Sequence, residues 1–509
     1  MTRAARGLDA LALGAGAVAI SILVTGGFTV GGVPVVRAED FVVAAALLAG
    51  IRAVVHPYPL PAVRPERVVL VGAVTYAVLM GVIAVTRHRA LRTHALDLGY
   101  YVQLVWNIAH GYGAYVTLPP MHAWGDHFSP VFYLFAPVAW VWPGAVPLLL
   151  AQTCVLAAGA LPVFGLARER LGNASIAAAL ALLYLVNPSL HGVNVRDVHP
   201  QAFAIALVPA AALAFERARY GWCAAALVAT LAGREDAAVA GVGFGLWVTV
   251  ARGRWLVGAL IAVASVAVLA VDVRFVLPYF RGEAYPHLHR HAYLGASLGE
   301  ILVSLVARPW LWLPVVATVP KLVYLLAMLA PLGFLPLLAP RALVAALPAL
   351  AINLLSKDPV LYHHRSQYTA FLLPFLVLAA IDGYRWLSAR PSRSRWPAVS
   401  PVRAIALGFL VSVVLTARTV NDLGIGKWRL DPTQHAAYRL MAVVPPDAGA
   451  SVHERLVPHL AMRREIYVFP TGVPRTEWML DLATDAPNVP PGYRTVVRDG
   501  PWELWRKDP

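Results

Sequence analysis

The chain has 509 residues, of which 59% are hydrophobic and only 14% are charged, and its mean hydropathy is +0.64. Soluble globular proteins carry about 25% charged residues, so this composition excludes a soluble protein and indicates a polytopic membrane protein. The formal charge of +15 does not indicate nucleic-acid binding, because the basic residues lie in short loops between apolar runs, as the positive-inside rule predicts.

Apolar runs follow one another along most of the chain, and we expect about thirteen membrane-spanning helices, several of them short or only half-inserted. Arg3 and Arg6 precede the first run, which places the N-terminus in the cytoplasm, and the loops that should return there are also basic. The runs cover residues 8–30, 41–55, 68–85, 131–142, 145–167, 176–190, 202–215, 222–232, 237–250, 255–277, 322–338, 343–355, 371–387 and 402–417.

This orientation divides the chain into three parts. Residues 1–67 hold two N-terminal helices and a cytoplasmic loop, and residues 68–418 form the main transmembrane domain. Within that domain, the loop 87–130 lies on the outer face. After Arg418 the sequence becomes polar enough for a soluble domain, residues 419–509, outside the cytoplasmic membrane.

The C-terminal segment has the pattern of a small α/β domain. A helix that ends at a proline pair is expected in PTQHAAYRLMAVVPPDA, and a second helix over HERLVPHLAM. Strands are expected over ASV, REIYVFP and TEWMLDL. RTVVRDGPWELWRK predicts a hairpin with Asp499-Gly500 at its turn. The expected fold is therefore an all-α membrane protein with a small extracytoplasmic α/β domain.

Carboxylates and histidines gather in the loops assigned to the outer face. Asp97 begins a stretch, 97–110, with the pattern of a helix lying in the membrane interface. Two acidic residues at a hairpin tip in an apolar context must lie at the interface or line a cavity, because a carboxylate at the bilayer centre costs about 2.5–3.5 kcal/mol. The candidates are Asp97, Asp126, His127, Asp197, His199, Glu235 and Asp236.

Several longer motifs resemble those of a family of bacterial predicted membrane proteins of unknown function. They are HALDLGYYVQLVWNIAHG, GDHFSPVFYLFAPVAWVWP, LLLAQTCVLAAGALPVFGLARERLG, RDVHP, GRED and SVHERLVPHLAMRREIYVFP, and the resemblance covers the chain from about residue 80 to about residue 480. That family in turn resembles the GT-C class of membrane glycosyltransferases, which take sugars from polyprenyl-phosphate donors on the outer face. This chain departs from the GT-C pattern with two helices before the acidic loop and with Arg234 where lysine is common.

The resemblance implies transfer of a sugar to a hydroxyl, which needs a base for the acceptor proton and positive charge at the departing phosphate. Asp97 is the candidate base, and its alternative role is a helix N-cap. Asp197, Glu235 and Asp236 would arrange a metal or the acceptor, unless they only pair with neighbours such as Arg234. The candidate substrate-binding residues are Tyr101, Gln103, Arg196, Arg234, Lys357 and Arg365. Their basic members can equally be interfacial anchors.

A divalent metal is the one candidate cofactor, with Asp126, His127 and His199 as ligands; loop or capping roles are the alternative. The histidines of HLHRH, namely His287, His289 and His291, can bind a metal adventitiously or form a solvated loop. Both cysteines, Cys154 and Cys223, fall inside apolar runs, which indicates neither a disulfide framework nor a metal cluster.

The sequence therefore favours a GT-C-type glycosyltransferase of the cytoplasmic membrane. Its partners would be a polyprenyl-phosphate-linked sugar, the bilayer, and a glycan or protein acceptor of the cell envelope, with no nucleic acid. A transporter or lipid flippase is the alternative, and it predicts ionisable residues at mid-span. Asp272 is the clearest such residue, whereas most others cluster at one face. A non-catalytic membrane assembly protein is the third possibility.

Overall fold

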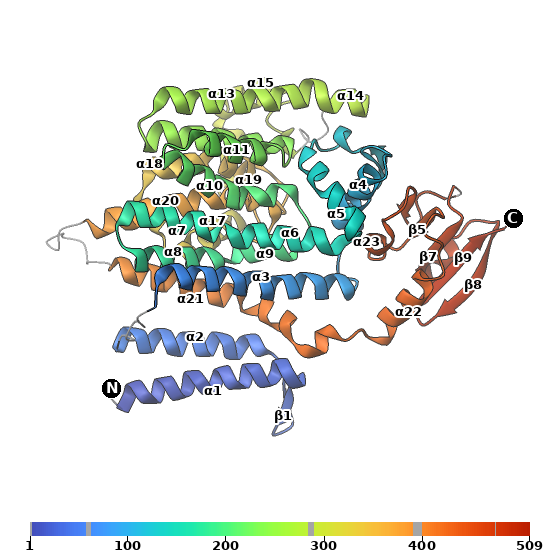
Figure 1. Ribbon diagram of the computed structural model, residues 1–509, viewed down its shortest axis with the longest axis horizontal. Helices are drawn as coiled ribbons and strands as arrows, with labels where there is room; N and C mark the ends of the chain where they lie inside the picture. Colours follow the sequence, from blue (N-terminus) through green and yellow to red (C-terminus); the bar gives the residue numbers. More distant parts are fainter. Residues whose placement is uncertain (1–2, 57–62, 284–289, 390–399, 474, 509) are drawn as a thin grey trace.

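The computed structural model describes residues 3–56, 63–283, 290–389, 400–473 and 475–508. It consists of a bundle of helices with a sheet-containing C-terminal domain at one end (Figure 1). The N-terminus lies at the opposite end of the molecule from the C-terminus (Figure 1). The chain is thus mainly helical with a small C-terminal sheet domain, as the sequence predicts.

The bundle is formed by the helices between α3 and α21. Their bounds are α3 (Pro65–Arg89), α6 (Ala145–Ala158), α7 (Ala160–Leu171), α8 (Ala174–Leu185), α9 (Pro188–Val195), α10 (Ala204–Glu216), α11 (Tyr220–Leu231), α12 (Ala238–Leu246), α13 (Trp255–Val271), α14 (Leu277–Arg281), α15 (Leu298–Ala307), α16 (Pro309–Val316), α17 (Val319–Leu329), α18 (Pro340–Leu343), α19 (Leu347–Leu355), α20 (Leu373–Ser388) and α21 (Pro401–Val420).

The expected count of about thirteen spans is not confirmed. Among the described residues, five helices are long and apolar enough to cross a membrane, or up to seven if each bent pair is one span. The bent pairs are α8 with α9, and 299–316. Several runs that were counted as spans form apolar helices of 10–17 residues, shorter than the roughly 20 residues that a bilayer core needs. The number of spans beyond these stays a prediction.

Small residues allow the central helices to approach one another closely. A Cβ atom on Gly159 would lie 2.2 Å from the Tyr184 hydroxyl of α8, so only glycine fits there. That hydroxyl donates to the carbonyl oxygen of Leu156 at 2.7 Å. Alanines such as Ala177 and Ala211 are fully buried between neighbouring helices. Close backbone approach of this kind is how helices associate inside membranes.

Helices α1 (Arg3–Thr25) and α2 (Ala38–Val55) form a separate hairpin beside α21, joined by the short strands β1 (Phe28–Val30) and β2 (Val33–Val35) (Figure 1). Buried Arg52 of α2 pairs with Asp9 of α1 at 3.1 Å. Asn421, just after α21, donates to Glu39. The two N-terminal helices expected from the sequence are present.

The C-terminal domain is a five-stranded mixed sheet with strand order β6-β5-β7-β9-β8. β5 runs parallel to β6 and β7, whereas β9 is antiparallel to β7 and β8. The predicted hairpin is β8–β9, with Asp499 paired to Trp502 across the turn. The elements are α22 (Pro432–Met441), β5 (Ala450–Val452), α23 (Val457–Leu460), β6 (Ile466–Val468), β7 (Trp478–Leu482), β8 (Tyr493–Asp499) and β9 (Trp502–Lys507).

The segment between α3 and α6 lies at the same end of the bundle as the C-terminal domain (Figure 1). It contains α4 (Tyr100–Ala109), β3 (Tyr115–Thr117), β4 (Pro120–His122) and α5 (Ala136–Val141). Eight of the ten residues of α4 are buried, on every side of the helix. Both faces of the expected amphipathic helix are therefore covered by protein within α4, and a position in the membrane interface stays a prediction.

Candidate functional site

Asp97 lies in a π-helical turn, Ala95–Gly99, that connects α3 to α4. Leu98 and Gly99 of this turn are buried, whereas 47% of the Asp97 side chain is exposed. Such wide turns recur at functional sites because they change the direction of a side chain relative to a regular helix. The N-cap of α4 is Gly99, so the alternative role of Asp97 as the cap of this helix is wrong.

His199 is the side chain that pairs with Asp97. Asp97 Oδ1 lies 3.4 Å from Nε2 of the buried His199 ring. Burial raises the pKa of Asp97, but His199, His94 and Arg234 outweigh this effect and hold the pKa below its ordinary value. Asp97 is therefore an ionised, half-exposed carboxylate at neutral pH.

Asp197 binds the residue that begins this turn. Its Oδ2 accepts a hydrogen bond from the backbone N–H of His94 at 2.9 Å and lies 3.3 Å from His94 Nδ1. The hydrogen bond to this carboxylate raises the pKa of His94. Asp197 itself is 5% exposed and has a φ of 48°, a left-handed conformation that non-glycine residues rarely adopt. Such strain is found where the surrounding structure requires one particular side-chain direction.

Gln152 of α6 fixes the loop that carries Asp197 and His199. Its Nε2 donates to the carbonyl oxygen of Asp197 at 2.9 Å, and its Oε1 accepts from the backbone N–H of His199 at 2.8 Å. Gln152 is completely buried. Sequence reasoning missed it, and the available signal was a polar residue inside an apolar run.

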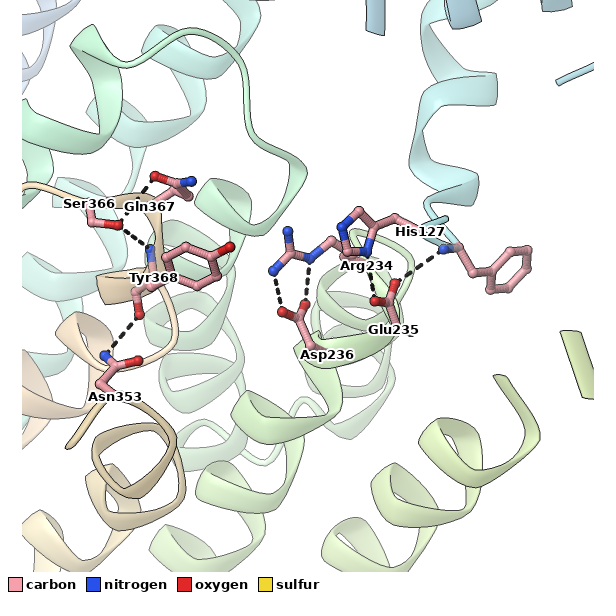
Figure 2. Close-up of polar contacts among 9 residues, drawn as sticks. His127, Arg234, Glu235, Asp236, Asn353, Ser366, Gln367 and Tyr368 are labelled. Atoms are coloured by element: carbon pink, nitrogen blue, oxygen red, sulfur yellow. Dashed lines mark hydrogen bonds and ion pairs between the residues drawn. The ribbon is translucent and has the colours of Figure 1, made fainter. Parts of the chain in front are cut away.

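Glu235 joins the hairpin tip to the loop that follows Asp126. Figure 2 shows its carboxylate between the His127 ring and the backbone of the next residue. Glu235 Oε1 lies 2.7 Å from His127 Nδ1, and Oε2 accepts from the N–H of Phe128 at 3.1 Å. Burial lowers the pKa of His127, but the Glu235 charge outweighs it, so this pKa is raised. With its carboxylate buried and held by these two contacts, Glu235 positions the loop.

Arg234 binds Asp236 through two nitrogen atoms, one of them Nε at 2.7 Å from Oδ1. Its guanidinium also lies over the Tyr368 ring, with Cζ 5.9 Å from the ring centre, and Figure 2 shows it between Tyr368 and the His127–Glu235 pair. Burial lowers the pKa of Arg234, but Asp236 outweighs this effect and the pKa is raised. Asp236 thus pairs with Arg234, which was the alternative to a role in the reaction. The charge of Arg234 also helps to lower the pKa of Asp97.

A group of arginines, here called the arginine cluster, is linked to Asp97 through Arg196. Its members are Arg87, Arg92, Arg196, Arg365 and Arg418, and Asp422 is the carboxylate among them. Asp422 lies 3.7 Å from Arg87 and 3.6 Å from Arg92. Burial lowers the pKa of Arg365, and the positive charge of Arg196 lowers it further. Such an excess of positive charge favours binding of an anion.

Arg196 connects the arginine cluster to the carboxylate site. This exposed residue lies between the end of α9 and Asp197. Partial desolvation of its guanidinium lowers its pKa, and the charge of Asp97 opposes this effect. His363 and His364 lie next to this cluster, and burial lowers the pKa of His364 to about 4, with the neighbouring positive groups lowering it as well. Arg196 and Arg365 were expected as phosphate-binding residues; Arg87, Arg92 and Arg418 were missed, because α3 and α21 bring them in from distant parts of the sequence.

Three other predicted substrate-binding residues have different surroundings. Lys357 Nζ lies 4.5 Å from the centre of the Tyr293 ring. Tyr101 is 6% exposed and stacks on Phe132. Gln103 is completely buried and donates to the carbonyl oxygens of two residues of the C-terminal domain.

The C-terminal domain packs directly on the turn that carries Asp97. A Cβ atom on Gly99 would lie 2.8 Å from Cγ1 of Val457 in α23. The rings of His88 and His459 stack 4.0 Å apart. Gln103 Nε2 donates to the carbonyl oxygen of Arg464 at 3.0 Å. This domain therefore covers and fixes one side of the site, which sequence reasoning missed because the contacts join segments about 360 residues apart.

The predicted metal ligands do not form one group. Among the described residues, no set of three or more histidine, cysteine, aspartate or glutamate side chains is placed to hold a metal ion. His127 pairs with Glu235, and His199 pairs with Asp97. His287 and His289 lie outside the described residues, and His291 Nε2 lies 3.2 Å from the Ile352 carbonyl oxygen. A divalent metal remains a prediction.

Comparison with known proteins gives a family and two similar structures. Among curated proteins, none matches this chain. Two crystal structures of ArnT from Cupriavidus metallidurans, one bound to undecaprenyl phosphate and one in the apo state, are each 15% identical to it with a TM-score of 0.49. Each match covers 86% of this chain and 97% of the ArnT chain. Residues 87–488, which hold the carboxylate site and most of the bundle, match the sequence profile described as Predicted membrane protein (DUF2079), so the chain belongs to that family.

Proposed function

We propose that this protein is a membrane glycosyltransferase that moves a sugar from a polyprenyl-phosphate donor to a hydroxyl acceptor. The observation that carries the proposal is the arrangement of Asp97 and the arginine cluster. An ionised, half-exposed carboxylate lies within electrostatic reach of Arg196, and Arg196 belongs to a group of five arginines. A base next to an anion-binding group is what transfer from a phosphate ester requires.

In the proposed reaction, the acceptor oxygen attacks the anomeric carbon of the sugar. The bond from that carbon to the phosphate oxygen breaks, and the lipid phosphate leaves with the electron pair. Asp97 accepts the proton of the acceptor hydroxyl. Arg196 and Arg365 bind the phosphate and stabilise the charge that develops on it.

The other carboxylates act by positioning. Asp197 holds the backbone of His94, and Glu235 holds the loop at His127 and Phe128. Asp236 orients Arg234, whose charge helps to keep Asp97 ionised. A divalent cation bound to the Asp97 carboxylate would add positive charge on the phosphate side. Loss of transfer after treatment with EDTA, restored by Mg²⁺ or Mn²⁺, would support that cation.

The site is proposed to face the outside of the cytoplasmic membrane, with an acceptor from the cell envelope. Basic residues of the loops at the other end support this orientation, among them Arg168, Arg217 and Arg252. Reporter fusions after Ser388 and after Asp508 test it. The two reporters are expected on opposite sides of the membrane, and the same side for both would contradict the orientation.

The function is tested with purified protein in liposomes that contain a radiolabelled polyprenyl-phosphate sugar and membrane extracts as the acceptor. Production of a labelled acceptor together with free polyprenyl phosphate is the expected result. Movement of the labelled lipid across the bilayer without any transfer would favour a flippase instead. Buried Asp272, near the end of α13, would then be the first residue to mutate.

A further inference from the structure

An apolar groove lies between α3, α8 and α21, here called the α3–α21 groove. Gly72, Leu79 and Ile83 of α3, Leu182 of α8, and Thr419 and Leu423 at the end of α21 line it. Its volume is about 320 Å³, at the lower end of the range of about 300–1,000 Å³ for ligand sites. Leu79 is 42% exposed on the outer surface of the bundle. The groove therefore opens toward the region that lipid chains occupy.

The α3–α21 groove ends at the arginine cluster. Thr419, which lines the groove, accepts a hydrogen bond from Arg365 Nη2 at 3.0 Å. Asp422, next to Leu423 of the groove, pairs with Arg87 and Arg92. An apolar surface thus continues directly into a positively charged one. A long apolar chain with a terminal phosphate has the matching distribution of polarity.

The length of the groove fits a lipid chain in the outer half of the bilayer. From Gly72 to Ile83, α3 rises by about 16 Å at 1.5 Å per residue. The hydrocarbon core of a bilayer is about 30 Å thick, so the groove runs through about half of it.

A second groove lies on the opposite face of α3 and offers a comparison. Val78 of α3 and Cys154 of α6 line it, together with Arg89, Lys427 and Trp428 at its charged end. Its volume of about 620 Å³ is larger. However, neither Arg89 nor Lys427 belongs to the arginine cluster, whereas Thr419 of the first groove accepts a hydrogen bond from Arg365 of that cluster. The first groove is therefore the one continuous with the site.

We infer that the α3–α21 groove holds the polyprenyl chain of the lipid phosphate, with the phosphate at Arg365 of the arginine cluster. The identity of the occupant rests on the proposed function. The inference adds which face of α3 the lipid binds and which residues contact its chain.

The first experiment maps the bound lipid. Purified protein in nanodiscs is irradiated with a polyprenyl phosphate that carries a diazirine on its chain, and the labelled residues are identified by mass spectrometry. Labels are expected on residues 416–423 of the α3–α21 groove. Labels on residues 150–154 and 427–430 of the second groove would overturn the inference.

The second experiment measures affinity for radiolabelled polyprenyl phosphate in two matched variants. Leu79→Trp fills the α3–α21 groove, and Val78→Trp adds the same ring to the second groove, one residue away on the same helix. Leu79→Trp should weaken binding about tenfold or more, because the chain loses its apolar contacts. Val78→Trp should leave binding unchanged, and the reverse pattern would overturn the inference.

A chain without phosphate separates the two parts of the ligand. Polyprenol is expected to bind more weakly than polyprenyl phosphate to the wild type, and Arg365→Met should remove most of that difference. Because these assays measure binding, their result is independent of transfer. Binding in the groove without any transfer would refute only the proposed function, and transfer with labels in the second groove would refute only this inference.

Discussion

Replacing Asp97 with asparagine tests the role of the carboxylate with little change in shape. Asparagine has nearly the same volume but cannot accept the proton of an acceptor hydroxyl. A general base contributes about 10²- to 10⁴-fold to the rate, which corresponds to about 2.7–5.4 kcal/mol of barrier. We therefore expect kcat of Asp97→Asn to fall about 100-fold or more.

The structure also predicts the effect of this change on stability and on donor binding. The Asp97 side chain is 47% exposed and 3.4 Å from His199, so solvent screens the pair and its loss should cost no more than about 1 kcal/mol. The charge of Asp97 acts on Arg196 of the arginine cluster. Removing that negative charge should leave the apparent affinity for the lipid phosphate unchanged or slightly higher. The signature is thus a lower kcat without a higher KM.

The assay follows transfer from a radiolabelled polyprenyl-phosphate sugar in liposomes, with thermal unfolding of the purified protein as a second readout. Asp499→Asn is the matched control, because Asp499 also has one ion-pair partner, Arg439 at 2.6 Å, but lies at the hairpin of the C-terminal domain. That variant should keep full activity. Full activity of Asp97→Asn would refute its role as the base, and equal loss in both variants would point to a general effect of the substitutions.

Three further predictions concern the groups that hold the site together. Gln103→Leu should destabilise the protein by about 2–3 kcal/mol, because the buried Thr117 N–H and the carbonyl oxygen of Arg464 lose their partner. Faster hydrogen exchange at residues 463–466 is the expected result, and unchanged exchange would contradict the prediction. Glu235→Gln should lower the free energy of unfolding by about 2–3 kcal/mol, since one amide oxygen cannot accept from both His127 and the Phe128 N–H. An unaltered melting temperature would show that these two contacts do not stabilise the loop. His94→Gln keeps the hydrogen bond from the backbone N–H of residue 94 to Asp197 but removes the imidazole ring. Because the pKa of His94 is raised above its ordinary 6.5, the stability that the charged ring contributes is fully present below pH 6.5 and is lost as pH rises through the raised pKa. The difference in melting temperature between wild type and this variant should therefore shrink above pH 6.5, and a difference that grows with pH would refute the assignment.

The sequence by itself determined the class of the protein and the hairpin at the end of its C-terminal domain. Low charge and long apolar runs are properties of composition, so they identify a membrane protein without any tertiary information. The β8–β9 hairpin was predictable because the turn at Asp499-Gly500 and the alternation of its strands are local signals. The basic flanks of the apolar runs also predict that Asp97, Asp197 and Glu235 all lie in loops on the same side of the membrane.

Only the tertiary structure decided which of these residues are available for chemistry. Asp97 and Glu235 are both carboxylates in predicted outer loops, yet one is half-exposed and the other is fully enclosed by His127 and Phe128. Exposure and pairing depend on which helices pack together, and local periodicity carries no information on that. Gln103 illustrates the difference, because its partners lie in the C-terminal domain, 360 residues later.

The arginine cluster was decided in the same way. The cluster joins the end of α3 to residues 196, 365 and 418. Like charges are brought together there by the bundle, against their mutual repulsion, because close packing of the helices supplies the larger free energy.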